Sequence, residues 1–351
     1  MRRAGLGRDL LGITVFAVVI AAAALSNASG VWLNLLMMAL YVALLASAWN
    51  ILAGYGGQFS FGHALFFGGG AYAQVLAQTA GGLNAWLALG LAAAAAALMG
   101  AAVGALSFRY GLKGSYFALV TLAFAEVLRI VAVSVPFTGG GVGLMLPLRE
   151  AASNLQFGSR RGFVLLALAL LVLALLACAW LRHSRFGAQL QAVRDNEDAA
   201  RAVGVNPFTV KLGAITLSAA LMGAGGAFYV QVFQYIDPGI AFGPATSVEA
   251  QVAVIVGGIG TLWGPLLGAV VLHLLAEATR NLFGQLPGLN MVVYGSVLVL
   301  IVLFRPRGLV SQCTAAPKLA HPLGGRTTTV VGLGALARAG QRVTEVFKRR
   351  G

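Results

Sequence analysis

Charged side chains are scarce in this chain. Asp, Glu, Lys and Arg make up 10% of its 351 residues, whereas about a quarter of a soluble domain is charged. The two cysteines, Cys178 and Cys313, supply neither a disulfide framework nor a metal-binding spacing. The sequence lacks a G-x-x-x-x-G-K-[ST] phosphate loop, so we expect no ATP hydrolysis by this chain. It also lacks the H-E-x-x-H and G-x-S-x-G patterns that would indicate an intramembrane enzyme.

Long apolar runs dominate the sequence instead. Hydrophobic residues make up 59% of it, and the mean hydropathy is +0.86. A backbone in lipid must satisfy its own hydrogen bonds, and a helix needs about 20 apolar residues to cross. Because the runs are too long for barrel strands, we predict an all-α, polytopic helical membrane protein. Seven runs support this prediction: Leu10–Ser26, Val31–Leu52, Ala85–Leu106, Ser115–Val135, Gly162–Leu181, Leu212–Val232 and Leu289–Phe304.

The formal net charge of +14 would suit a nucleic-acid-binding protein, but its distribution follows a membrane topology. With a cytoplasmic N-terminus, 19 of the 24 Lys and Arg residues fall in four segments that alternation places on the cytoplasmic side. This is the positive-inside bias, and it sets the orientation. We therefore predict a chain embedded in a lipid bilayer, with both termini cytoplasmic and no nucleic-acid partner.

The two ends of the chain differ in character. The first thirty residues resemble a secretory signal peptide, with basic residues, an apolar core and small residues after it. Because the following spans need an inside start, we interpret this segment as an uncleaved first helix. We expect a membrane domain over residues 1–310. Over residues 311–351 we expect a basic cytoplasmic tail that is disordered or forms a surface helix.

The stretch Gly54–Ala73 carries seven glycines and one histidine in 20 residues. The alternation of spans requires it to cross outward. Glycine allows helices to approach closely and also permits a bend or unwinding, so static packing and a moving gate both stay open. We expect His63 to donate a hydrogen bond between helices rather than to carry protons. The gate or pathway candidates in this stretch are Gly57, Gly62, His63 and Gly69.

A second irregular region lies between Ser247 and Glu277, where two short apolar arms flank the sequence IGTLW. The final span must begin outside, so this region leaves and re-enters the same face. Interruption by Gly258, Gly260 and Pro265 predicts broken or re-entrant helices, which are tolerated at membrane depth only against protein or a water-filled cavity. With this pair we expect eight to ten crossings.

Two charged residues share one face of the run Ser115–Val135. Glu126 and Arg129 are three residues apart. Each alone would cost about 3 kcal/mol at mid-membrane, which pairing partly offsets. We interpret them either as a structural pair or as residues that line the path or contact a partner. Glu126, Glu249 and His273 also define the alternative function, a proton-coupled secondary carrier of small solutes.

The interior loop Arg182–Lys211 is the strongest signal outside the apolar runs. Residues Ala188–Val203 are compatible with one helix, and Gly204 supplies its stop. Glu197 and Arg201 are four residues apart in the favourable order. A narrow apolar strip would run along this helix, formed by Leu190, Val193, Ala200 and Val203. The helix is expected either to lie on the membrane surface or to dock into another protein.

The segment Gly187–Asn206 reads GxxLxAxRxNExAAxAxGxN and resembles the coupling loop of branched-chain amino acid ABC transporter permeases. Gly114–Val131 is similar to the LivM-type members of that family rather than to their LivH-type partners. The resemblance covers about residues 34 to 310. Three further segments resemble the same family: Asn50–Ala73, Gly257–Val271 and Leu303–Val310.

The resemblance implies one half of a membrane pore in a bacterial inner membrane, paired with a second, LivH-like permease. Two cytoplasmic ATPases would use ATP-Mg, a periplasmic substrate-binding protein would deliver substrate, and no cofactor is expected on this chain. The substrate would be leucine, isoleucine or valine, although relatives also handle urea and other amides. A proton-coupled carrier would not need a helix that docks into another protein, so this helix distinguishes the importer subunit from the carrier. The residues expected to meet an ATPase are Gly187, Arg194, Asn196, Glu197, Ala200 and Gly204.

Overall fold

The computed structural model describes residues 2–26 and 29–283, together with residues 292, 293, 295, 296, 299, 300, 303 and 308–310. Within these residues the regular structure is helical apart from one antiparallel pair of short strands, β1 (Leu144–Met145) and β2 (Tyr235–Ile236). The predicted all-α class is confirmed. The α-helices are α1 (Arg2–Leu25), α2 (Gly30–Asn50), α3 (Ala64–Thr79), α4 (Ala85–Arg109), α5 (Gly114–Ser134), α6 (Arg160–His183), α7 (Arg185–Asp195), α8 (Glu197–Ala202), α9 (Pro207–Phe233), α10 (Pro238–Phe242), α11 (Pro244–Gly257) and α12 (Gly264–Phe283).

Seven helical segments of the described residues are long and apolar enough to span a membrane. Six of them correspond to predicted runs and comprise α1, α2, α4, α5, α6 and α9. The seventh combines α10 with α11. The last predicted run, Leu289–Phe304, lies largely outside the described residues, and the tail after residue 310 lies entirely outside them.

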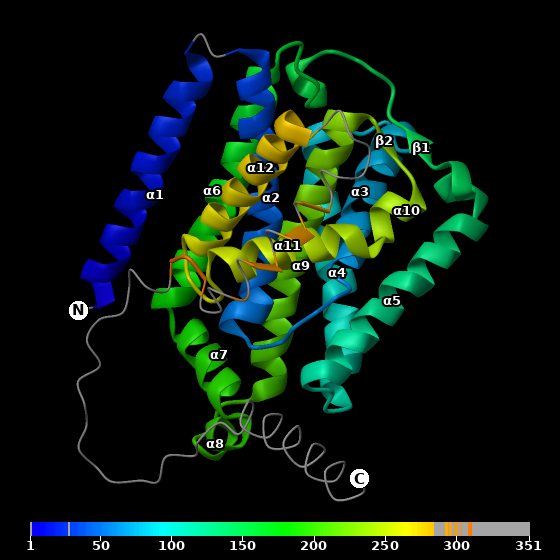
Figure 1. Cartoon of the computed structure of the whole chain (residues 1–351). Coiled ribbons are helices and arrows are strands. Elements are labelled where there is room, and N and C mark those ends of the chain that lie inside the picture. Colours follow the sequence, from blue (N-terminus) through cyan, green and yellow to red (C-terminus); the bar gives the residue numbers. More distant parts are fainter. Residues whose placement is uncertain are drawn as a thin grey trace, which may run out of the picture. The chain divides into compact units, whose positions relative to one another are not determined.

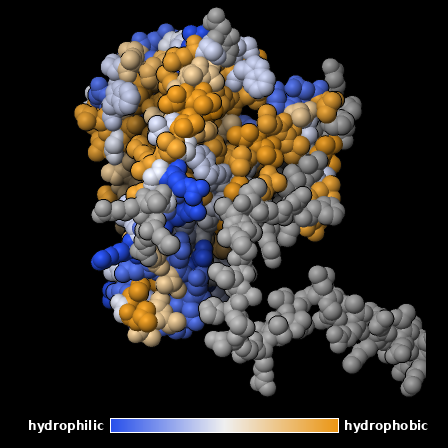
Figure 2. All heavy atoms as spheres, turned by 90° about the vertical axis from the view of Figure 1, so that its left-hand side faces the viewer, coloured by the Kyte–Doolittle hydropathy of each residue, from blue (hydrophilic) through white to orange (hydrophobic). Residues whose placement is uncertain are grey.

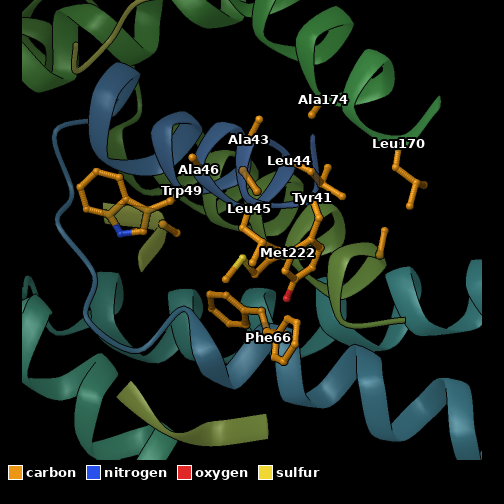
Figure 3. Close-up of a cluster of buried hydrophobic side chains, with 14 of the residues drawn as sticks. Tyr41, Ala43, Leu44, Leu45, Ala46, Trp49, Phe66, Leu170, Ala174 and Met222 are labelled. Atoms are coloured by element: carbon orange, nitrogen blue, oxygen red, sulfur yellow. The ribbon is translucent and has the colours of Figure 1, made fainter. Parts of the chain in front are cut away.

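The helix α2 lies at the centre of the bundle, where it packs against α6, α9, α11 and α12 (Figure 1). Every residue from Ala39 to Leu52 is buried. A helix that is apolar on all sides is expected to be surrounded by other elements. Figure 3 shows Tyr41 of α2 beside Met222 of α9 and Phe66 of α3. The core of the bundle is therefore built around α2.

The second half of the glycine-rich stretch belongs to α3 and packs tightly. Gly70 faces the backbone of Gly223 in α9, and Gly69 faces the side chain of Met99 in α4. Small residues at such positions let helix backbones approach closely in membranes. These contacts support the static-packing interpretation for this part of the stretch.

The first half of the glycine-rich stretch breaks the helix. After α2 the chain passes into a π-helical turn, Ile51–Tyr55, and residues 57–63 then connect to α3 without a regular helix. Single π turns inside helices are frequently found at functional sites. Because α3 has only 16 residues, the stretch Gly54–Ala73 does not form one continuous spanning helix, and its outward crossing stays a prediction.

The predicted interruption between the two later apolar arms is present. α11 ends at Gly257, α12 begins at Gly264, and turns and bends separate them. Gly258 and Gly260 take positive φ angles of 133° and 74°, which other residues rarely adopt. Figure 1 shows α11 running across the bundle and α12 running along it. α12 continues to Phe283, past the end of the predicted arm.

We predict that Gly70→Ala destabilises the fold more than Gly69→Ala. The new methyl group at position 70 would meet the Gly223 backbone, which cannot move aside, whereas at position 69 it would meet the flexible Met99 side chain. Overpacking of this kind lowers the free energy of unfolding by about 1–3 kcal/mol, and we expect less than about 1 kcal/mol at position 69. Thermal unfolding of the two purified variants in detergent measures the difference, and equal melting temperatures would contradict it.

Candidate functional site

Two short helices, α7 and α8, lie at the lower end of the described residues in Figure 1, and Figure 2 shows that end as mostly hydrophilic below an apolar band. Asn196 separates them and caps α8, because its Oδ1 accepts the backbone N–H groups of Asp198 and Ala199 at 3.1 and 3.0 Å. Such a cap stabilises a new helix start. The single helix predicted over Ala188–Val203 is therefore wrong: the segment is two helices with a break at Asn196.

The apolar strip predicted along this segment faces the interior of the protein itself. Leu190, Val193 and Ala200 are buried, and Leu190 packs beside Gly56 at the end of the π-helical turn. Val203, the fourth member of the predicted strip, is 79% exposed. A partner that docks here would therefore contact the opposite face of α7 and α8, with Val203 on it.

The two glycines of the predicted coupling set have different structural roles. Gly187, in the first turn of α7, packs against the carbonyl group of Leu181 at the end of α6. Gly204 follows α8 with a φ of 88°, and no atom would obstruct a side chain there. Gly187 thus allows the sharp turn from α6 into α7, whereas Gly204 supplies the left-handed conformation that ends α8.

Glu197 is the centre of a cluster of cations. Its carboxylate lies 2.7 Å from Nζ of Lys211, 3.3 Å from Nζ of Lys113 and 3.4 Å from Nη2 of Arg201. Burial raises the pKa of Glu197, but the hydrogen bonds and charges of Lys211 and Lys113 outweigh it and hold the pKa below its usual value. The predicted pairing with Arg201 is present. The cluster also ties α8 to the α4–α5 turn and to the start of α9.

Arg194 connects α7 to the end of α2. Its Nη1 donates a hydrogen bond to the carbonyl oxygen of Gly54, in the π-helical turn, at 2.9 Å. Gly57 has a φ of 66°, and a Cβ at that position would lie 2.5 Å from Cγ of Arg194. Both features require glycine at position 57. The predicted coupling residue Arg194 and the gate candidate Gly57 are therefore neighbours.

Asn50 joins the same turn to the break between α11 and α12. Its Oδ1 accepts the N–H of Gly260 at 2.8 Å, and its Nδ2 donates to the carbonyl oxygen of Thr261 at 3.0 Å. A Cβ on Gly260 would lie 3.1 Å from the carbonyl oxygen of Gly54. Two helix breaks and α7 thus meet at one place. We call the following group the coupling junction: Asn50, Gly54, Gly57, Arg194 and Gly260.

Gly258 and Pro265 border the coupling junction. The N–H groups of Leu309 and Val310 donate to the carbonyl groups of the last two residues of α11 at 3.0 and 2.9 Å. This pairing brings Gly308 so near that a Cβ on it would lie 2.5 Å from the Cα of Gly258. Pro265 is buried as the second residue of α12, in the first turn, where proline is tolerated because the N–H group it lacks would have no partner within the helix. Both predicted residues therefore shape the break between α11 and α12.

His63 and Gly62 each contact a neighbouring helix, apart from the coupling junction. Nε2 of His63 lies 2.9 Å from Oγ of Ser218, and that hydroxyl donates to the carbonyl oxygen of Ala48 at 2.6 Å. Because the hydroxyl proton is already used, the network assigns the imidazole proton to Nε2. Gly62 packs against the backbone carbonyl of Thr121 in α5. The geometry fits the expectation that His63 donates a hydrogen bond between helices.

Residues 31–302 match the family described as the permease component of the branched-chain amino acid transport system. The chain belongs to this family. It is therefore a subunit of a transport system rather than an enzyme.

The permease is similar to the high-affinity branched-chain amino acid transport system permease protein LivM of Salmonella typhimurium. The two are 29% identical over 306 residues, which cover 80% of this chain and 70% of the relative. LivM of Escherichia coli is 30% identical over 294 residues, covering 77% and 68%. LivH of Escherichia coli is 28% identical over 141 residues, covering 40% and 44%. No solved structure gives a significant match to the permease.

The permease exposes a charged pair on α5. Arg129 donates from Nε and Nη2 to the two carboxylate oxygens of Glu126 at 2.9 and 2.6 Å, so the predicted pairing is present. The Glu126 and Arg129 side chains are 49% and 36% exposed, midway along a helix of 21 residues. Ionised groups are unfavourable against lipid chains. This face of α5 therefore suits a partner subunit or water.

Asn50, Lys113 and Lys211 are absent from the residues predicted for the site. Asn50 carries a usable signal, because an amide inside an apolar run requires hydrogen-bond partners in a membrane. Lys113 and Lys211 meet Glu197 only through the folding of α4, α5 and α9 around α8. No local spacing in the sequence relates those two lysines to Glu197.

We predict that Glu197→Gln lowers the free energy of unfolding by about 3 kcal/mol at pH 7, because it leaves the buried Lys211 ammonium without a carboxylate. The double variant Glu197→Gln/Lys211→Met should recover most of this loss. Because the folded pKa of Glu197 is lowered, the difference from the parent is complete above the unfolded pKa of about 4.3 and disappears as the pH falls through the folded value. Denaturant unfolding across this pH range measures the effect, and an unchanged single variant at pH 7 would contradict it.

Proposed function

We propose that this permease is the LivM-type membrane subunit of an ATP-driven importer of branched-chain amino acids in a bacterial inner membrane. A LivH-like permease forms the other half of the pathway, two cytoplasmic ATPases use ATP-Mg, and a periplasmic binding protein delivers the substrate. Both termini of this chain are cytoplasmic, and it binds no cofactor. The names of the LivM and LivH relatives support the substrate class and the pairing of two permeases.

The mechanistic part of the proposal rests on the hydrogen bond from Arg194 to the carbonyl group of Gly54. Arg194 lies on α7, and Gly54 lies where α2 leaves its α-helical path. Asn50 extends the contact to Gly260 and Thr261 in the break between α11 and α12. A displacement of α7 would therefore reach two broken helices through direct contacts. Coupling requires an element of this kind with two arrangements that both sites can bias.

The surface proposed to meet an ATPase is the exposed face of α7 and α8. Arg185, Gln189 and Val203 lie on it. The Asn196 cap, the Glu197 cluster and the Arg194 contact hold the two helices to the membrane bundle. Because the helices are fixed on their inner side, a force applied to the outer side is passed to the bundle rather than lost in a flexible loop.

A proton-coupled carrier receives less support. Glu249 and His273 line one cavity, but Glu126 is paired with Arg129 on α5, which does not contribute to that cavity. The three groups named for a relay therefore do not share one site. The family match and the LivM relatives favour the importer subunit.

We predict that Val203→Asp prevents co-purification of the ATPases while the chain stays folded. Val203 is 79% exposed, so the carboxylate is hydrated in the free chain but would lose water in a docked complex. We expect ATPase binding and amino acid uptake to fall by at least about tenfold, as for a central interface residue. Val142→Asp is the matched control, since Val142 is 80% exposed in the loop after α5. A Val203→Asp variant that retains the ATPases and full uptake would refute the docking assignment.

We also predict that Arg194→Gln separates ATP hydrolysis from transport. The substitution removes the guanidinium that donates to the Gly54 carbonyl group, and a buried acceptor that loses its partner costs about 1–3 kcal/mol. The ATPases should still bind, whereas uptake per ATP hydrolysed should fall about tenfold in proteoliposomes. Arg109→Gln, an exposed arginine at the end of α4, is the control and should leave the ratio unchanged. An unaltered ratio in Arg194→Gln would exclude the junction from coupling.

A further inference from the structure

A cavity of about 540 Å³, with both polar and apolar lining, lies between α2, α9, α10, α11 and α12, away from the coupling junction. Small-molecule sites in proteins usually measure about 300–1,000 Å³. Of the residues named from the sequence, Glu249 and His273 of the alternative carrier function line it, whereas the predicted coupling and gate residues do not. Its walls combine carboxylate, imidazole, hydroxyl, aliphatic and backbone groups.

Two carboxylates line this cavity and form no ion pair in the described part of the chain, although His273 of α12 lines the cavity as well. Glu249 of α11 forms neither an ion pair nor a hydrogen bond there. Asp237 uses Oδ1 to accept the N–H groups of Gly239 and Ile240 at the start of α10, at 2.7 and 3.0 Å, but meets no cation. An unpaired carboxylate inside a membrane bundle is unfavourable unless water or a cation reaches it. The cavity therefore favours a positively charged group.

A tyrosine hydroxyl also opens onto the cavity. Tyr41 lines the cavity from α2 and is 6% exposed as a residue. Its hydroxyl group forms no hydrogen bond among the residues that the structure describes, and its oxygen is accessible rather than enclosed. A ligand in the cavity would therefore find a hydrogen-bonding partner in this hydroxyl.

The cavity also offers a place for a negatively charged group, at the N-terminus of α11. Ala245 and Thr246, the second and third residues of α11, line the cavity. Their backbone N–H groups have no partner within the helix, and α11 has no side-chain cap. The N-terminus of a helix interrupted at membrane depth attracts the anionic group of a small solute. Thr246 and Glu249 are three residues apart on α11, so this end and the carboxylate lie on one helix face.

Aliphatic side chains complete the lining. Met38 and Val42 are four residues apart on α2 and so share one face, and Ile240 comes from α10. A compact solute with an ammonium group, a carboxylate and a branched aliphatic chain would meet a complementary group for each of its parts.

We propose that this cavity binds a zwitterionic amino acid with an aliphatic side chain on its way through the permease. Glu249 and Asp237 take the ammonium group, the N-terminus of α11 takes the carboxylate, and Met38, Val42 and Ile240 contact the side chain. This inference rests on the proposed function and adds to it a site within the membrane subunit that selects for both charges of the substrate.

Binding of tritiated L-leucine to the full-length chain in phospholipid nanodiscs tests the site. The parent should bind saturably, and Glu249→Gln should weaken binding by at least about tenfold. Glu249→Asp, which keeps the charge, should retain most of the affinity, and Glu150→Gln, in an exposed loop, should match the parent. 3-Methylbutylamine and 4-methylpentanoate, which each lack one of the two charges, should compete at least about tenfold more weakly than unlabelled leucine.

The cavity assignment is overturned if the parent chain binds no leucine, if Glu249→Gln binds it as the parent does, or if either singly charged analogue competes as well as leucine. Uptake by cells that lack the chain tests the proposed function separately. If their uptake of leucine, isoleucine and valine stays normal, the importer proposal fails. If uptake is lost but the leucine-binding measurements contradict the cavity, the importer proposal stands and only the site within the membrane subunit is refuted.

Discussion

A carbonyl group that leaves the helical hydrogen-bond pattern inside a membrane protein must find a donor within the protein, because lipid offers none. At the end of α2 this requirement falls on Gly54, and Arg194 meets it from 140 residues away in the sequence. The arginine side chain reaches the carbonyl group because position 57 carries no side chain. A break in a central membrane helix is thereby held by α7, which lies at the hydrophilic end. The position of α7 and the conformation of the break then depend on each other.

The backbone groups in the break between α11 and α12 must also be hydrogen-bonded within the protein, and other residues supply their partners. The amide of Asn50 saturates one N–H and one carbonyl group between α11 and α12, and Leu309 and Val310 donate to the carbonyl groups that end α11. Polar groups in a low-dielectric interior strengthen one another when all are satisfied and destabilise the fold when one is not. The two breaks are therefore one hydrogen-bonded unit. This accounts for Asn50, a buried amide in the most apolar helix of the core.

Several parts of this fold are predictable from the sequence, and the reasons are specific. Apolar runs of spanning length placed α1, α2, α4, α5, α6 and α9, and Gly258, Gly260 and Pro265 located the interruption before α12. The apolar strip on α7 was visible, but periodicity shows only that a face is buried, not whether this chain or a partner buries it. Helix periodicity also concealed the cap at Asn196. The Arg194–Gly54 contact has no local signal, because only the tertiary fold brings those residues together.

Some carboxylates of the membrane bundle are paired with a basic side chain and others are not, and this difference matters for transport. Glu126 carries its counter-charge with it in Arg129, so the pair is balanced whatever lies beside it. Glu249 and Asp237 form no ion pair in the described part of the chain, and the basic side chain that lines the cavity with them is His273 rather than a lysine or an arginine. A fixed lysine or arginine would neutralise those two carboxylates, but it would also fill the cavity permanently. Carboxylates left without a fixed partner instead favour a cation that arrives and departs, and the ammonium group of a travelling amino acid has that property.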